Sequence, residues 1–350
     1  MNPPDSHQRR RLIVGATATT TLAALGRAAH AQSRQLFVNS WGGAWTAAEK
    51  AAYYDPFEAE TGIKVTPVNG VNYNKLKAQV AARSYEFDIT ECDLDKAIRA
   101  VKENLLEVPP PGVISEATLF PGALQSNAVH NCVLGMCPTW RPDRWKGEKP
   151  RTWADYWNVK KFPGVRAGYR HATRMLAIAL VADGVPMDKL YPLDIDRGFR
   201  KLDEIKPHIR VWWAENSQAQ QLLRDGEVDL IPMFAARAAD LASQGVQVEL
   251  SWEGALCVTN MYAVARGAPN IANAWQFIRF VSQPQRQAAF CNRLFYSPSN
   301  VKAFEFIKPE AAKWMPTHPD NAKKVFYTDS MWESQHFDAI NERFNRWLAS

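Results

Sequence analysis

The chain has 350 residues, a net charge of +6, five cysteines and 13 tryptophans. A chain of this length usually exceeds one simple core and divides into two lobes. Beyond residue 31 the basic residues form no Lys/Arg block, so the sequence gives no support for a nucleic-acid partner.

The first 31 residues have the order of regions found in an export signal. A basic cluster, Arg9–Arg11, precedes the 14 uncharged residues Leu12–Leu25, which are too few to span a bilayer, and Ala29–Ala31 supplies a small-x-small cleavage pattern. Arg9–Ile13 also resembles the twin-arginine motif. We therefore expect export by that route and a soluble periplasmic protein that begins at Gln32. An N-terminal anchoring or amphipathic helix is the alternative.

Removal of that segment, with its four Arg and one Asp, lowers the net charge from +6 to +3. The five cysteines are odd in number, so at least one is unpaired. Between Cys132 and Cys137 the sequence reads as a buried strand, along which five residues span roughly 16 Å. That separation excludes a disulfide unless the chain turns sharply at Gly135, so small buried core residues are the simpler interpretation.

The mature chain begins as an alternation of strands and helices. Gln35–Asn39 has strand character, and Thr46–Thr61 carries apolar residues at helical spacing. Thr46 is a candidate N-cap, and Glu49, three residues later, completes a capping box. Gly62 ends this helix before the next strand, which begins at Ile63.

A second helix over Tyr73–Ala82, a strand over Phe87–Ile89 and a third helix over Leu94–Glu103 continue the pattern. This order of elements predicts an α/β fold with a mixed, mostly parallel sheet and helices on both faces.

Pro109–Gly112 interrupts the alternation, and Val129–Met136 then reads as a long apolar strand that crosses between two lobes. A second α/β unit begins at Trp153–Trp157, and Trp252–Ala265 is a candidate return crossing. We expect lobe 1 to comprise residues 32–130 and 259–305 and lobe 2 to comprise residues 131–258. Residues 306–350 are predicted to form a C-terminal helical segment that packs across the lobes.

Four passages in chain order carry a family pattern: Val38–Gly43, Phe57–Val65 (F-E-x-x-T-G-I-x-V), Thr152–Trp157 (S/T-W-x-D-L-W) and Asp225–Leu230 (x-G-E-V-x-x). Together they resemble the extracellular solute-binding proteins of ABC importers, in the branch that contains the spermidine/putrescine receptors. The resemblance implies a type II periplasmic binding-protein fold, in which two lobes joined by two crossing strands close on one ligand. It also implies ABC permease membrane subunits as partners, and we expect a monomer without cofactor or metal.

In open α/β sheets, ligands bind beyond the carboxyl ends of strands and near helix N-termini, which here indicates Ser40–Trp45, Thr90–Asp95 and Phe234–Arg237. Gly42 and Gly43 allow close backbone approach to a ligand, although an ordinary turn is the alternative. Trp41 and Phe234 lie where the family places ligand-stacking aromatics, and packing inside a lobe is the alternative for both.

Departures from the polyamine receptors indicate the ligand class. An alignment with few gaps puts His171 and Arg174 where those receptors have acids, and Asn260 replaces the carboxylate on the second crossing strand. Arginine binds a carboxylate with two charge-assisted hydrogen bonds. We therefore expect a small organic anion, a carboxylate, as ligand; a polyamine ligand, with Arg174 in an outward ion pair, is the alternative. The candidate binding residues are Trp41, Gly42, Gly43, Asp93, Arg141, His171, Arg174, Phe234, Arg237 and Asn260.

The sequence contains no G-x-S-x-G, H-E-x-x-H, P-loop or G-x-G-x-x-G motif, so we expect a binding protein and not an enzyme. An enzyme acting on a small metabolite in the cleft is the remote alternative. The acidic run from Glu86 to Asp95 suggests a cation site or, more simply, an Asp88 that ends a strand and a helix N-terminus stabilised by Asp93 and Asp95.

Overall fold

The structure is a computed structural model that describes residues 33–114, 119 and 123–350. The expected export segment, residues 1–31, lies outside the described residues. Residues 34–350 form one unit by their internal contacts. Within the described ranges no helix is both long enough and apolar enough to cross a membrane.

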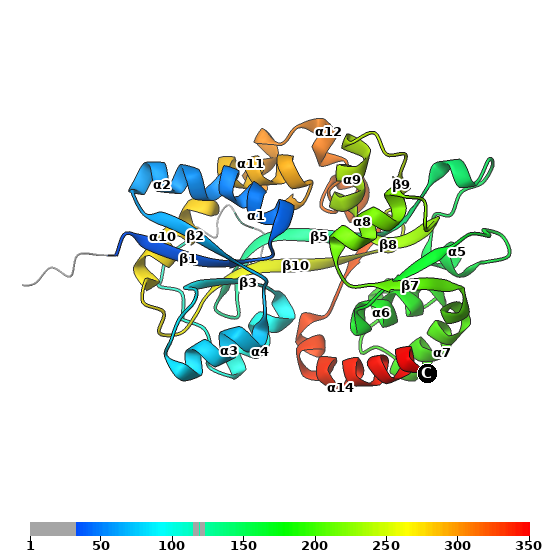
Figure 1. Cartoon of the computed structure of the whole chain (residues 1–350), viewed down its shortest axis with the longest axis horizontal. Coiled ribbons are helices and arrows are strands. Elements are labelled where there is room, and N and C mark those ends of the chain that lie inside the picture. Colours follow the sequence, from blue (N-terminus) through cyan, green and yellow to red (C-terminus); the bar gives the residue numbers. More distant parts are fainter. Residues whose placement is uncertain (1–32, 115–118, 120–122) are drawn as a thin grey trace, which may run out of the picture. The chain divides into compact units, whose positions relative to one another are not determined.

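One mixed β-sheet runs through this unit in the strand order β2-β1-β3-β10-β5-β8-β6-β7 (Figure 1). The main strands are β1 Gln35–Ser40, β2 Lys64–Asn69, β3 Ile89–Asp93, β5 Ala128–Trp140, β6 Arg166–Tyr169, β7 Ile209–Trp213, β8 Leu230–Phe234 and β10 Ala255–Val264. Short strands lie at the margins: β4 Leu124–Gln125, β9 Glu249–Leu250, β11 Ser297–Pro298 and β12 Val325–Tyr327. The group β2-β1-β3 and the group β8-β6-β7 are each parallel, whereas β10 runs antiparallel to β3 and β5, and β5 runs antiparallel to β8. The short strand β12 pairs in parallel with β10. The predicted mixed, mostly parallel α/β sheet is confirmed.

Helices cover both faces of each strand group (Figure 1). They are α1 Gly43–Glu49, α2 Asp55–Thr61, α3 Tyr73–Ala82, α4 Leu94–Lys102, α5 Trp153–Trp157, α6 Ala172–Ala182, α7 Ile195–Ile205, α8 Asn216–Arg224, α9 Ala235–Ser243, α10 Ile271–Val281, α11 Pro284–Leu294, α12 Pro309–Ala312, α13 Pro319–Ala322 and α14 Ser330–Ala349. Around the first group, α1, α2, α10 and α11 lie on one face and α3 and α4 on the other. Around the second group, α8 and α9 lie on one face and α6 and α7 on the other.

The first helix begins earlier than the sequence predicts, and the capping-box prediction is wrong. Gly42 is the N-cap, at φ 90°, a backbone conformation that favours glycine. Thr46 lies inside α1, where its hydroxyl accepts from the Gly42 N–H at 3.0 Å. Glu49 is fully buried and accepts hydrogen bonds from Ser40 and Tyr54, so it does not reach back to a cap. Gly62 ends α2 in a left-handed conformation, as predicted.

The strand predicted at Phe87–Ile89 lies further along the chain, as β3. This shift places Glu91 and Asp93 on the strand. The acidic residues of this segment do not form one cluster, because Asp88, Glu91 and Asp93 each bind different partners. Asp88 accepts from the backbone of Phe37 and from Asn270, and among the described residues no group of three or more acidic, His or Cys side chains forms a metal site. All five cysteines are free and buried, as expected for core residues.

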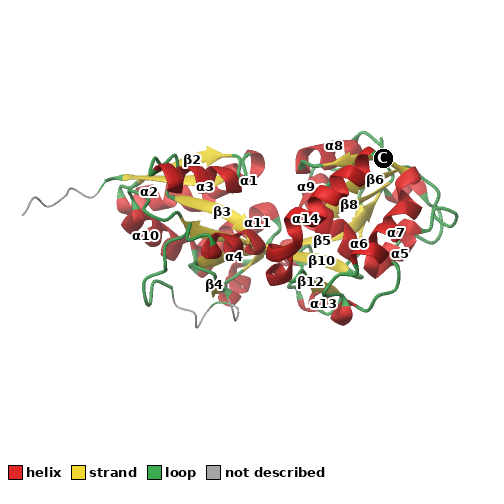
Figure 2. Cartoon of the chain, turned by 90° about the horizontal axis from the view of Figure 1, so that it is seen from below, coloured by secondary structure: helices red, strands yellow, loops and turns green. Residues whose placement is uncertain are grey.

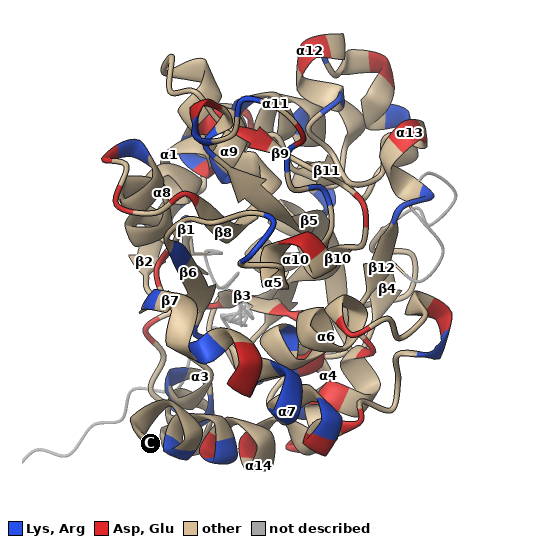
Figure 3. Ribbon diagram, turned by 90° about the vertical axis from the view of Figure 1, so that its right-hand side faces the viewer, with Lys and Arg blue, Asp and Glu red and all other residues tan. Residues whose placement is uncertain are grey.

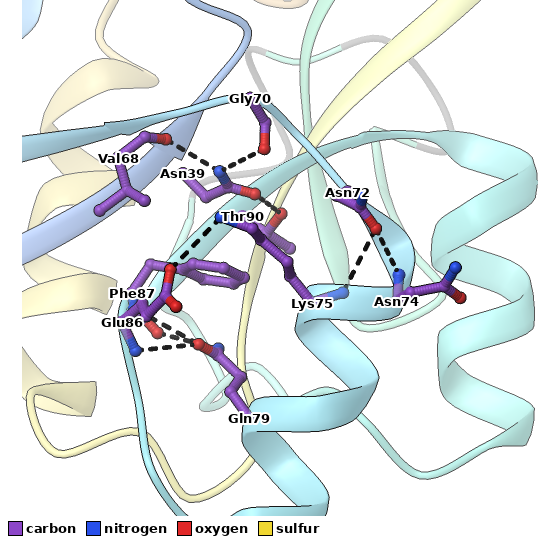
Figure 4. Close-up of polar contacts among 10 residues, drawn as sticks. All are labelled: Asn39, Val68, Gly70, Asn72, Asn74, Lys75, Gln79, Glu86, Phe87 and Thr90. Carbon is purple, nitrogen blue, oxygen red and sulfur yellow. Dashed lines mark hydrogen bonds and ion pairs between the residues drawn. The ribbon is translucent and has the colours of Figure 1, made fainter.

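Side-chain hydrogen bonds link the carboxyl ends of β1 and β2 to each other and to Thr90 near the start of β3 (Figure 4). Asn39 Nδ2 donates to the carbonyls of Val68 at 2.8 Å and Gly70 at 3.2 Å, and Thr90 Oγ1 donates to Asn39 Oδ1 at 3.1 Å. Asn72 caps α3 by accepting from two backbone N–H groups. The loops that follow β1 and β2 therefore start from fixed positions.

The last helix, α14, packs against both α4 and α6, as the view from below shows (Figure 2). Arg99 of α4 bonds to Asp338 at 2.8 Å, and Asp196 of α7 bonds to Arg343 at 2.6 Å. Both α7 and α14 carry positively and negatively charged residues (Figure 3). The C-terminal helix thus contacts elements of both strand groups.

Gly168 on β6 allows the ring of Trp212 on β7 to pack directly on the sheet. A Cβ atom at this position would lie 2.4 Å from two carbons of that ring. We therefore expect Gly168→Ala to lower the free energy of unfolding by about 1–3 kcal/mol through overpacking, measured by urea denaturation. Gly147→Ala is the control, because no atom lies within 4 Å of its Cβ position; equal effects of the two substitutions would contradict the explanation.

Candidate ligand-binding site

A cavity of about 410 Å³ lies where the carboxyl ends of β1, β3, β6, β7 and β8 meet. Leu134 of β5 and Val258 and Asn260 of β10 line it between the two strand groups. The full lining is Trp41–Trp45, Asp93, Leu134, Tyr169, Arg174, Glu215–Ser217, Gln220, Phe234, Arg237, Val258, Asn260 and Tyr296. This is the position at which α/β sheets bind ligands.

Aromatic side chains form much of the wall. Tyr169 stacks on Trp213 with ring centroids 4.2 Å apart and meets Phe234 edge-on at 6.3 Å. Tyr296 packs against Trp45 at 5.1 Å. Trp41 is 42% exposed, so it belongs to the rim of the cavity and not to a core. Such rings provide rigid apolar surfaces for the body of a small ligand.

Arg174 of α6 points into the cavity and not outward. Its side chain is only 6% exposed, and its guanidinium donates to Asp93 at the end of β3 and to the Tyr169 hydroxyl at 3.3 Å. The ion pair therefore joins the two strand groups. Burial raises the pKa of Asp93 above its ordinary value, although Arg174 opposes this change. Asp93 is the N-cap residue of α4, as predicted, but its side chain makes no cap hydrogen bond there.

His171 lies in an adjoining chamber of about 250 Å³ and not in the main cavity. Burial lowers the pKa of His171 well below its ordinary value, and the charges of Arg174 and Lys96 lower it further. The imidazole is therefore neutral at pH 7. Its ring lies 5.5 Å from that of Tyr169.

Most of the other candidates line the main cavity. Gly42 and Gly43 do so with positive φ angles, together with Phe234 and Asn260. Arg237 also lines it, close to the Tyr296 hydroxyl, and its Nε has no hydrogen-bond partner within the described part of the chain.

Arg141 is the exception: the sequence indicates it as a candidate binding residue, but it does not line the main cavity. Because β5 runs antiparallel to β8, its last residue, Trp140, pairs with Leu230 at the amino end of β8. Arg141 follows there and bonds to Asp143 at 2.9 Å. A larger hollow of about 810 Å³ lies at this edge, lined in part by Trp140, but the carboxyl ends of the parallel strands β6, β7 and β8 do not contribute to its lining.

The sequence missed the start of α8. Glu215, Asn216, Ser217 and Gln220 line the cavity just beyond the carboxyl end of β7. Ligands bind beyond the carboxyl ends of parallel strands. This rule would have indicated these four residues too, if β7 had been recognised from the sequence as a parallel strand. Tyr296 follows α11, where no strand pattern indicates it.

A pair of buried carboxyl groups lies directly beneath the loop after β1. Glu91 accepts from the Trp45 indole at 2.8 Å and from the Trp41 backbone N–H at 3.2 Å. It is also hydrogen-bonded to Glu49, which binds the Tyr262 hydroxyl. Burial raises the pKa of Glu91 well above its ordinary value, and Glu49 raises it further. Glu91 thus holds two cavity residues in place.

Residues 52–321 match the model of a family described as bacterial extracellular solute-binding protein. The chain belongs to this family. The gamma-aminobutyric acid-binding protein of Pseudomonas aeruginosa is 34% identical over 334 residues, which cover 93% of this chain and 94% of that protein. Among solved structures, the Atu4243-GABA receptor has 34% identity and a TM-score of 0.85, and the match covers 90% of this chain and 98% of that one. An ABC transporter substrate-binding protein from Bradyrhizobium japonicum has 33% identity and a TM-score of 0.85, with 90% and 99% covered.

Membership in the solute-binding family confirms two predictions. The fold is of the two-lobed binding-protein type. The protein is a substrate-binding receptor of the kind that serves ABC transporters. The residue boundaries of the lobes stay a prediction.

Proposed function

We propose that this receptor binds a small carboxylate in the 410 Å³ cavity and delivers it to an ABC permease in the membrane. The observation that carries the proposal is the buried guanidinium of Arg174, which faces an aromatic cavity at the strand ends. Arg237 provides a second cation in the same lining. Two relatives are named for gamma-aminobutyric acid, a small solute with one carboxylate and one ammonium group. That these relatives are named as a binding protein and a receptor is consistent with a non-catalytic role.

The charges of the cavity do not favour a polyamine. Its acidic lining residues are Asp93 and Glu215, and Asp93 is already paired with Arg174. The ammonium groups of spermidine would therefore lie near two arginines. Glu215 would be the one lining carboxylate without an ion-pair partner among the described residues. A cation in such surroundings is repelled and loses hydration without gaining a full set of counter-charges.

The proposal is tested by a thermal-shift and calorimetric screen of the mature receptor with γ-aminobutyrate, butyrate, succinate and spermidine. A bound carboxylate at a thousandfold excess over Kd should stabilise the fold by about 4 kcal/mol. Spermidine should give no shift. Tight binding of spermidine without binding of any carboxylate would establish the polyamine function instead.

We further propose that residues 1–31 are a twin-arginine export signal and that the mature receptor is a periplasmic monomer beginning at Gln32. The extracellular character of the family supports this location. Mass spectrometry of the periplasmic protein should find Gln32 at the N-terminus, and replacing both Arg9 and Arg10 with lysine should block export. An intact Met1 in the periplasm would contradict cleavage.

A further inference from the structure

The chamber of about 250 Å³ that contains His171 adjoins the main cavity directly. Trp41, Asp93, Tyr169 and Arg174 line both spaces and so form the wall between them. The exposed Trp41 is the part of this wall least held by packing. A ligand in the main cavity therefore lies next to the side chamber.

The far walls of the side chamber are mainly apolar. Val71, Leu76 and Ala100 line it together with the ring of Tyr73. Leu76 and Ala100 are 3% and 1% exposed, so α3 and α4 hold these surfaces rigidly. A space of this kind favours an apolar group removed from water.

Two buried nitrogen atoms at this chamber have no hydrogen-bond partner among the described residues: Arg174 Nε and His171 Nδ1. The Arg174 N–H is always a donor, and a buried donor without an acceptor costs about 1–3 kcal/mol. The neutral imidazole of His171 can present a second N–H toward the same acceptor. An oxygen acceptor on the ligand would relieve this cost.

Both cations that line the chamber already have a carboxylate partner. Arg174 pairs with Asp93, and Lys96 pairs with Asp95 at 3.0 Å. Glu91 has a raised pKa and supplies no full negative charge. The ligand carboxylate in the main cavity adds a further negative charge beside Arg174, so an uncharged acceptor fits the side chamber better than a second carboxylate.

We infer that the ligand of this receptor is a carboxylate with an extended arm, and that the side chamber binds this arm, which is uncharged and largely apolar and carries a carbonyl-type acceptor. The inference rests on the proposed function and specifies its ligand class. The carboxylate occupies the main cavity with Arg174 and Arg237, and the arm passes beside Trp41 and Tyr169. Its acceptor oxygen meets Arg174 Nε and His171.

Three probes test this arrangement by calorimetry: butyrate, 4-benzamidobutyrate and 6-phenylhexanoate. The last two have arms of matched length and ring, but only 4-benzamidobutyrate has the carbonyl. We expect 4-benzamidobutyrate to bind about tenfold or more tighter than each of the other two, because it alone satisfies the buried donors. Equal or weaker binding of 4-benzamidobutyrate than of butyrate would overturn the inference.

Ala100→Leu, which fills the chamber from α4, provides the matching variant. It should remove the advantage of 4-benzamidobutyrate and leave butyrate affinity unchanged, since Ala100 does not line the main cavity. If the folded variant still binds 4-benzamidobutyrate more tightly than butyrate, the side chamber does not bind the arm. If the variant does not fold, the three probes on the wild-type receptor decide alone. Failure of butyrate and γ-aminobutyrate to bind would refute the proposed function itself, and the inference with it.

Discussion

Replacing Arg174 with alanine should lower the affinity of the receptor for γ-aminobutyrate by at least about 100-fold. Hydrogen bonds to charged groups contribute about 1.5–3 kcal/mol each, and a guanidinium binds a carboxylate with two of them. The substitution also leaves Asp93 without its cation beside the anionic ligand. Isothermal titration calorimetry of the wild type, Arg174→Ala and Arg174→Lys at pH 7 measures the loss. Lysine should restore affinity only in part, because it lacks the planar pair of donors.

Arg141→Ala is the matched control for this experiment. It removes the same charge from a residue that lies at the amino end of β8, away from the cavity, and whose guanidinium bonds to an exposed Asp143. Its affinity for γ-aminobutyrate should stay within about twofold of the wild type, because exposed ion pairs contribute little. Comparable losses in the two variants would show that net charge, and not a specific contact at Arg174, governs binding.

Glu91→Gln should make the receptor more stable than the wild type at pH 8 and flatten the dependence of its stability on pH. The folded protein raises the pKa of Glu91 well above its ordinary value of 4.5, so the folded state holds this proton more tightly than the unfolded state. The stability that the proton contributes is complete below about pH 4.5 and is lost as pH rises toward the folded pKa. Each pH unit between the unfolded and the folded pKa lowers the free energy of unfolding by about 1.4 kcal/mol. A glutamine is neutral at every pH and keeps an oxygen acceptor for the Trp45 indole.

Urea denaturation of both proteins at pH 5, 6.5 and 8 measures this effect as a difference in unfolding free energy. Burial and Asp95 also raise the pKa of Glu333, to about 7, but that group is present in both proteins and cancels in the difference. Glu305→Gln, at an exposed site, is the control and should follow the wild-type curve. Parallel curves for the wild type and Glu91→Gln would show that Glu91 does not hold its proton more tightly in the folded protein.

Local patterns in the sequence were sufficient for several elements and for three of the strand ends that line the cavity. Helical spacing located α3 to the residue, and the rule for carboxyl strand ends indicated three of the loops that contribute to the lining. These features depend on neighbours within a few residues, which is why they are readable from one sequence.

The errors concern polar residues whose partners are distant in the chain. Glu49 matches a capping box locally, but Tyr262, 213 residues away, binds it in the core. Asp93 matches a helix cap, but Arg174, 81 residues away, takes its carboxylate. Arg141 was misplaced because the pattern of an apolar strand does not show which way it runs beside its neighbours. Contacts between distant parts of the chain determine the positions of Glu49, Asp93 and Arg141.

The position of β10 in the sheet also constrains the order in which this chain can fold. β10 pairs with both β3 and β5, although it comes more than a hundred residues after either in the sequence. Until residues 255–264 leave the ribosome, the edge of β3 that carries Asp93 has no partner strand, and contacts of such long sequence separation form slowly. Fragments that end before Ala255 are therefore expected to stay unfolded. The nascent chain depends on protection from aggregation until residues 255–264 have been synthesised.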